Sequence, residues 1–183
     1  MILAAEPDLH PDGLFAGPPP ADDRAWWLAH TKPRQEKALA RQLCAAGLSF
    51  YLPCAPHRTR VRNRVLTSYR PLFPGYVFVR VSDDERGGVY VENRVARLAT
   101  VGDQDRLWAD LRNVRRLLDL GRPVTAEDRL GPGAPVAVRT GPLAGLTGTV
   151  VRAVSGHKFV VRVDLIQRGV SVVVDRATLG KLG

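Results

Sequence analysis

The residues that could carry out catalysis are few and do not gather in the sequence. The four histidines are scattered, and no serine, cysteine or carboxylate stands in the setting of a nucleophile or a general acid or base. Cys44, Cys54 and His57 could ligate zinc, but their spacing matches no familiar zinc site, and two ordinary reduced thiols are the favoured interpretation. The glycine-rich stretch 141–148 lacks the Lys-Ser/Thr pair of a phosphate-binding loop. We therefore predict a protein that is not an enzyme and holds no metal and no cofactor.

Charge is the first indication of a binding function. The chain has 27 Lys and Arg against 18 Asp and Glu, a formal net charge of +9. Five of the acids lie in residues 1–23, which hold no Lys or Arg, so that segment carries −5 and the remainder +14. A charge of this size on a small folded body favours a polyanionic partner, although a solvated basic surface would have the same composition.

An arginine row follows His57 in the segment H-R-T-R-V-R-N-R. In an extended chain alternate side chains point to one side, so the four arginines would share a face. Like charges on one face repel, and folding alone would not favour them, whereas guanidinium groups suit a phosphate backbone. No aromatic residue is interleaved, which favours backbone contact over base stacking. We predict nucleic-acid contact, rather than a solvated hairpin edge, by Arg58, Arg60, Arg62 and Arg64.

An aromatic turn stands in the stretch R-P-L-F-P-G-Y-V-F-V-R, residues 70–80. Pro74 fixes φ and Gly75 accepts a positive φ, so a sharp turn should lead directly into an extended strand. The turn would bring Phe73 and Tyr76 close together, where a loop that faces solvent is usually polar. These aromatics either cap the core, as most aromatics do, or form a recognition surface.

Two adjacent tryptophans open the ordered part of the chain, in the stretch W-W-L-A-H. On a strand, Trp26 and Trp27 would point to opposite faces of the sheet. We expect one of them to lie in the core and the other in a recognition surface, and the sequence leaves open which is which.

The elements that position these residues alternate between strands and helices. Pro33 suits the first turn of one helix, and Gly47 suits the position just beyond its end. Asp103 or Asp105 can cap a second helix, which Gly121 should end. The expected order is a strand from residue 26, a helix over 33–46, strands at 48–53, 73–81 and 97–101, and a helix through residue 120. This order is typical of an α+β fold in which helices flank an antiparallel sheet.

Composition divides the chain into four parts. Residues 1–23 are acidic and Pro-rich, and we expect a disordered tail that is a solubilising extension rather than a screen for the basic face. Residues 24–120 hold the α+β domain, and residues 121–131 form a short linker. Residues 132–183 hold short β runs separated by turns, which is typical of a small all-β barrel of about five strands.

Location is indicated by what the sequence lacks. There is no apolar run of ~18 residues and no basic segment followed by an apolar one at the start, so we expect neither a membrane span nor a secretory signal. Two cysteines are too few for a disulfide framework. We expect a cytoplasmic protein that does not bind membranes and is a monomer.

The chain resembles the NusG transcription elongation factors over about residues 25–183. W-W-L-A-H-T-K-P-R-Q-E-K, together with R-P-L-F-P-G-Y-V-F-V, is similar to their N-terminal (NGN) domain. The segment 133–150, G-A-P-V-A-V-R-T-G-P-L-A-G-L-T-G-T-V, is similar to the KOW motif that opens their SH3-like C-terminal barrel. The order and spacing of the motifs in one chain carry the resemblance, because KOW segments also occur in ribosomal proteins.

The resemblance implies a factor that rides on RNA polymerase. In the family an apolar depression on the N-terminal domain docks on the clamp helices, and closing the clamp reduces pausing or termination. The arginine row would then lie near upstream or non-template DNA at the transcription bubble. Carried over by motif, the polymerase-binding residues are Trp26, Trp27, Phe73, Pro74, Gly75 and Tyr76.

The KOW domain of the family recruits either the termination factor Rho or a small-subunit ribosomal protein. Here the usual aromatics are aliphatic and Gln167 replaces a glycine, which counts against Rho. The segment 94–103 also lacks the housekeeping T-P-x-V-x-x-F-V-G pattern, which favours a specialised antitermination paralogue of the RfaH kind over the housekeeping factor. The partner-binding positions carried over are Leu143, Leu146, Leu165, Ile166 and Arg168. A ribosome-associated or RNA-binding KOW protein is the alternative, and it leaves the aromatic turn without a role.

Overall fold

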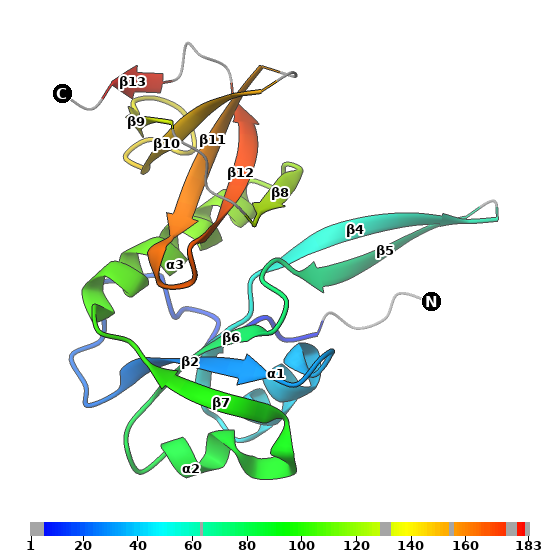
Figure 1. The fold of residues 1–183 in the computed structure, drawn as a ribbon, viewed down its shortest axis with the longest axis vertical. Coiled ribbons are helices and arrows are strands. Elements are labelled where there is room, and N and C mark those ends of the chain that lie inside the picture. Colours follow the sequence, from blue (N-terminus) through cyan, green and yellow to red (C-terminus); the bar gives the residue numbers. More distant parts are fainter. Residues whose placement is uncertain (1–5, 63, 129–132, 154–155, 175–178, 182–183) are drawn as a thin grey trace. The chain divides into compact units, whose positions relative to one another are not determined.

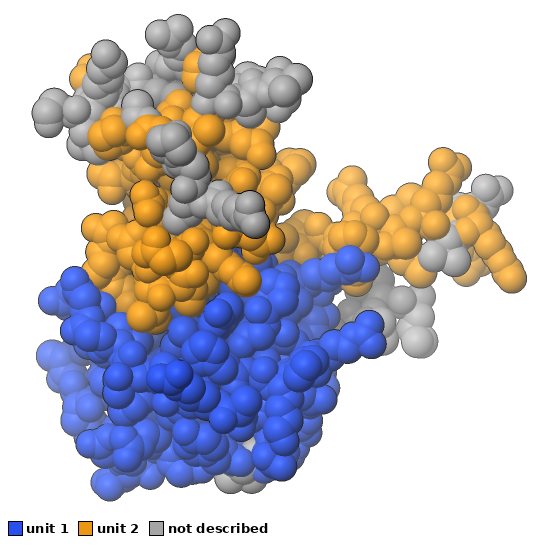
Figure 2. Space-filling view, in the orientation of Figure 1, with its two compact units in different colours: residues 1–54, 69–105 blue, residues 55–68, 106–183 orange. Residues whose placement is uncertain are grey.

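The structure is a computed structural model that describes residues 6–62, 64–128, 133–153, 156–174 and 179–181. The chain divides into two compact units, shown in different colours in Figure 2. Unit 1 comprises residues 1–54 and 69–105, and unit 2 comprises residues 55–68 and 106–183.

Unit 1 is built on a five-stranded antiparallel sheet with the order β1-β3-β6-β2-β7; Figure 1 labels its strands β6, β2 and β7. The order interleaves early and late parts of the chain, so β6 lies between β3 and β2. The strands are β1 (Leu9–His10), β2 (Ala25–Thr31), β3 (Ser49–Tyr51), β6 (Tyr76–Val81) and β7 (Val95–Thr100). The helices of this unit are α1 (Glu36–Ala45), α2 (Arg86–Val89) and the 3-10 turn η1 (Val91–Asn93).

Helix α1 ends as the sequence predicts and begins later than it predicts. Gly47 takes φ 68° beyond the last turn, and its N–H bonds to the carbonyl of Cys44. The helix starts at Glu36 rather than at Pro33, because Arg34 adopts φ 62°, which is not helical.

The main core of unit 1 lies between α1 and one face of the sheet. Every second residue of β6 points to it, as a strand with one buried face requires. Leu39, Leu43, Val77 and Val79 are fully buried there. The other residues of β6, among them Phe78, point to the opposite face, which α1 does not cover.

Residues 6–23 are not the disordered tail that their composition predicts. Within them β1 pairs with β3, and the apolar pair Leu14 and Phe15 is buried. Asp22 forms an ion pair with Arg80 of β6. The prediction failed because the partners of these few apolar and acidic residues lie far along the chain, where composition cannot reveal them. We call residues 6–23 the N-terminal strap.

Unit 2 contains most of the third helix and a six-stranded sheet. Helix α3 (Gln104–Asp119) buries the apolar residues Leu107, Leu111, Val114 and Leu117. Gly121 follows it at φ 64°. The sheet has the order β13-β9-β10-β11-β12-β8, with antiparallel neighbours. Its strands are β8 (Val124–Glu127), β9 (Ala134–Val138), β10 (Thr147–Ala153), β11 (Gly156–Val163), β12 (Arg168–Val174) and β13 (Leu179–Lys181), with the 3-10 turn η2 (Asp164–Ile166) before β12.

The C-terminal sheet differs from expectation in one place. Strand β8 falls inside the predicted linker 121–131, where Val124–Glu127 pairs with β12. Position 148 in β10 requires glycine because neighbouring atoms of β11 lie too close for a side chain. A Cβ there would lie 2.7 Å from the ring of Phe159 and 2.6 Å from the Val160 carbonyl. The mixed sheets with few helices agree with the predicted α+β class, and closure of the C-terminal sheet into a barrel remains a prediction.

A separate two-stranded ribbon consists of β4 (Cys54–Val61) and β5 (Arg64–Pro71). The hydroxyl of Ser68 donates to the His57 carbonyl across it, at 3.4 Å. No helix among the described residues is long and apolar enough to cross a membrane.

Candidate binding surfaces

The face of the unit 1 sheet turned away from α1 is rich in aromatic side chains. In an antiparallel pair, directly opposite residues point to the same face. Register pairs Trp26 with Arg80 and His30 with Tyr76, so these four side chains share it. We define the aromatic face as Trp26, Leu28, His30, Tyr51, Tyr76, Phe78 and Arg80.

The predicted turn at one end of this face is held by a buried carboxylate. Gly75 adopts φ 85°, and its N–H donates to Oε1 of Glu36 at 2.7 Å. Its carbonyl accepts from the Thr31 N–H at 2.9 Å. Glu36 is 8% exposed, so this bond fixes the turn from inside the protein. Sequence reasoning missed Glu36, because an acid in the first turn of a helix is usually solvated.

The two tryptophans point to opposite faces, as predicted. Trp26 lies on the aromatic face and is only 2% exposed. Trp27 is half-buried against the α1 core, and the guanidinium carbon of Arg86 lies 4.9 Å from the centre of its ring.

The residues of the predicted docking set differ in their access to solvent. Phe73 is 1% exposed and meets Phe78 edge to face, with ring centres 6.3 Å apart, so it belongs to the core. Pro74 is exposed and Tyr76 is half-buried. The Tyr76 ring meets His30 edge-on at 5.0 Å. Burial, together with the nearby Arg97, lowers the pKa of His30, so its ring is neutral at pH 7.

The N-terminal strap lies over the aromatic face. The Phe15 ring stacks on Trp26, with centres 6.1 Å apart and planes 8° apart, and meets Tyr51 edge-on at 5.2 Å. Beyond it, Asp22 accepts two hydrogen bonds from the Arg80 guanidinium, at 3.0 and 2.5 Å. Sequence reasoning missed this contact, for which the adjacent apolar residues Leu14 and Phe15 were the available signal.

The arginine row is broken by a chain reversal. Arg58 and Arg60 share a face of β4, but Arg62 has φ 52° between the strands and Arg64 begins β5. The prediction that all four point to one side of a single extended strand is therefore wrong. All four are exposed, as are Val65, Leu66 and Tyr69 of β5, so the ribbon presents both cations and an aromatic ring.

The predicted partner-binding residues of unit 2 also differ in exposure. Leu143 and Leu146 are buried, at 7% and 0% exposed. Leu165 in η2 is 38% exposed, and Ile166 beside it is half-buried. Arg168 is half-buried and pairs with Asp128 at 3.6 Å. Leu165 is therefore the apolar member of the set that is accessible to a partner.

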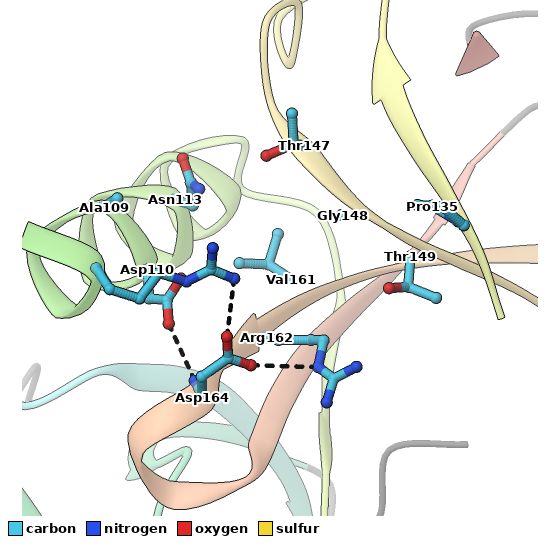
Figure 3. A pocket seen from close by; sticks show the side chains of 11 residues that line it. Ala109, Asp110, Asn113, Pro135, Thr147, Gly148, Thr149, Val161, Arg162 and Asp164 are labelled. Carbon is cyan, nitrogen blue, oxygen red and sulfur yellow. Dashed lines mark hydrogen bonds and ion pairs between the residues drawn. The ribbon is translucent and has the colours of Figure 1, made fainter. Parts of the chain in front are cut away.

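A pocket in unit 2 is lined by α3 and strands β9 to β11 (Figure 3). Its charged side chains pair with one another across it. Arg106 contacts Asp110 at 3.2 Å and Asp164 at 2.8 Å, and Arg162 contacts Asp164 at 3.4 Å. The Asp164 N–H also donates to Asp110 at 3.0 Å. These charges balance, so we interpret the pocket as an internal contact and not as an anion site.

Metal ligands do not gather in the part of the chain that the structure describes, where no group of three or more His, Cys, Asp or Glu could hold an ion. Cys44 and Cys54 are free thiols. Burial raises the pKa of Cys54 to about 12, so this thiol stays protonated at neutral pH.

Comparison with known proteins gives one family. A model of the family described as "Transcription termination factor nusG" matches residues 24–125, more than half of the chain. A search of curated proteins found no match. A solved structure described as "Domain interaction in Thermotoga maritima NusG" is similar with a TM-score of 0.50 and 20% sequence identity, covering 87% of this chain and 98% of that one. At this identity the likeness shows the fold alone.

Proposed function

The chain belongs to the NusG family of transcription factors, and from this premise we propose that it is a non-enzymatic elongation and antitermination factor that docks on RNA polymerase through the aromatic face. Proteins of this family bind RNA polymerase and act in transcription elongation and termination. The docking target is the pair of clamp helices, and the expected result of docking is less pausing or termination.

The choice of the aromatic face as the docking surface rests on one observation. Trp26, His30 and Tyr76 gather on the sheet face that α1 leaves uncovered, and the turn beside them is fixed by the buried bond from Gly75 to Glu36. Aromatic side chains on a rigid sheet lose little conformational freedom on binding, which suits a docking surface. Phe73 is buried and packs on Phe78, so we expect it to support this surface rather than to contact the polymerase directly.

The test is co-elution with core RNA polymerase. Tyr76→Ala should weaken binding by about tenfold or more, because a partly buried aromatic anchor is lost from the surface. Tyr90→Ala removes an exposed tyrosine outside the aromatic face and is the matched control. Both variants should first be shown to be folded by circular dichroism. Equal binding by the two would contradict the aromatic face as the docking surface.

We further propose that the β4–β5 ribbon contacts the DNA backbone near the transcription bubble. Its four arginines are exposed, and the exposed ring of Tyr69 on β5 could stack on an unpaired base. The same exposed ribbon supports the alternative, an RNA- or ribosome-binding protein. RNA binding that survives Tyr76→Ala, without any association with polymerase, would favour that alternative.

The C-terminal sheet is proposed as a KOW domain that recruits a partner through Leu165, Ile166 and Arg168. The candidate partners are a small-subunit ribosomal protein and Rho, and Gln167 favours the ribosomal protein. The sequence departures at 94–103 favour a specialised antitermination factor over a housekeeping one. A pull-down of each purified partner with wild type and with Leu165→Ala tests this surface.

A further inference from the structure

We propose that the N-terminal strap is an intramolecular occupant of the aromatic face, which RNA polymerase must displace in order to dock. The inference rests on the proposed function for the identity of the partner.

The strap covers the centre of the face with side chains, not with a continuous sheet. Leu14 and Phe15 are 6% and 8% exposed, and Phe15 lies flat on Trp26. The turns that present them are closed locally, by bonds from the Leu14 N–H to Pro11 and from the Ala16 N–H to Gly13. Such a turn can leave the face as a unit without breaking the bonds that shape it.

The two ends of the strap hold it by different means. At the first end β1 pairs with β3, and the Leu52 N–H donates to the Asp8 carbonyl at 2.7 Å. At the second end Arg80 holds the Asp22 carboxylate and also donates to the Pro20 carbonyl at 3.1 Å. Between Phe15 and Asp22 most residues are exposed, in the sequence A-G-P-P-P-A. The apolar turn is thus the part of the strap that can lift while β1 stays in place.

The strap also shows what kind of partner the face accepts. An aromatic ring fits against Trp26 and Tyr51, and a carboxylate fits against Arg80, whose side chain is 6% exposed. The matching partner is a polypeptide surface that presents an apolar side chain next to an acidic one. The strap mimics that surface, and its acidic charge is opposite to that of the remaining chain.

A variant that opens the strap tests the inference. Leu14→Ser with Phe15→Ser removes the apolar turn but keeps β1 and Asp22. Ala16→Ser with Pro18→Ser changes two exposed neighbours and is the matched control. Each protein carries 5-fluorotryptophan, and the Trp26 resonance is assigned from Trp26→Phe. Solvent isotope shifts of the fluorine resonance report the exposure of Trp26, and titration measures the affinity for core RNA polymerase.

We expect the opened variant to expose Trp26 and to bind polymerase about tenfold more tightly, because a larger fraction of molecules is competent to bind. The control should match the wild type. An exposed Trp26 with unchanged or weaker binding would overturn the inference and leave the proposed function standing. If no form binds polymerase, the proposed function fails and the inference fails with it.

A second variant covers the case in which the opened protein does not fold. Asp22→Asn keeps the apolar turn and removes only the charge that Arg80 holds. It should bind polymerase about two- to threefold more tightly than the wild type, since one of the two contacts that close the strap over the face is weakened. The same affinity as the wild type in folded Asp22→Asn, together with loss of fold in the opened variant, would mean that the strap is part of the core and would overturn the inference.

Discussion

Glu36 shows how one side chain can fix the backbone of a surface turn. Its carboxylate accepts the Gly75 N–H at 2.7 Å from a buried position. Glu36→Ala would leave this N–H without its acceptor, and we expect it to lower the free energy of unfolding by about 1–3 kcal/mol. Glu36→Gln keeps an acceptor oxygen and should cost less than Glu36→Ala. Urea unfolding of the two variants measures the difference, and equal losses would contradict the role of the hydrogen bond.

His30 gives the protein a pH dependence with a definite sign. Burial and Arg97 lower its pKa in the folded state below the ordinary 6.5. Below that pH the unfolded chain binds the proton more readily, so the folded state should lose stability as pH falls through 6.5. His30→Gln should flatten the fall in the free energy of unfolding between pH 7.5 and 5. His57→Gln, a change on the ribbon, should keep it; a wild-type slope in His30→Gln would contradict this origin.

Among the elements, the β4–β5 ribbon makes the clearest quantitative prediction. Each arginine that neutralises a phosphate adds about 0.9 to the slope of log affinity against log salt concentration. Arg58→Gln with Arg60→Gln should therefore lower the slope for bubble-containing DNA by up to about 2. Arg112→Gln with Arg122→Gln removes the same charge from exposed sites outside the ribbon. Fluorescence anisotropy at several salt concentrations measures the DNA affinity of each double variant and hence its salt slope. Equal slopes for the two double variants would exclude specific contact by the ribbon.

Two leucines of unit 2 have different expected roles, one in packing and the other in partner recognition. Leu146 is fully buried, and Leu146→Ala should lower the free energy of unfolding by about 2–5 kcal/mol. Leu165 is exposed in η2, and Leu165→Ala should change stability by less than ~0.5 kcal/mol while it weakens binding of the recruited partner. Thermal unfolding and a partner pull-down measure the two effects. A large loss of stability in Leu165→Ala would remove it from the proposed surface.

Over the whole molecule, the features that depend on neighbouring residues could be predicted from the sequence, and those that depend on long-range contacts could not. The turn at Gly75, the strand after it and the helix end at Gly47 follow from residues within a few positions of one another. Each depends on a backbone angle that glycine accepts more readily than other residues, so the residue type reveals it. The separation of Trp26 and Trp27 onto opposite faces follows from strand geometry in the same way.

The features that the sequence did not predict depend on pairs of residues that are distant in the chain. Phe15 meets Trp26 and Tyr51, Asp22 meets Arg80, and Glu36 meets Gly75. The Pro-rich, acidic composition of residues 1–23 led to a prediction of disorder, although the segment contains the apolar residues Leu14 and Phe15, which are buried. The break in the arginine row at Arg62 was missed for a different reason, because a positive φ at arginine has no signature in residue type.

The position of β1 at the edge of the unit 1 sheet has a consequence for solubility. This short strand occupies the outer edge of β3, where Leu9 pairs with Tyr51 and His10 with Phe50. A chain shortened to begin at residue 24 would present that edge without a partner, next to the uncovered rings of the aromatic face. Open edges beside apolar surface favour self-association. Such a chain should elute from size exclusion at a volume that depends on its concentration, whereas Leu14→Ser with Phe15→Ser, which keeps β1, should not.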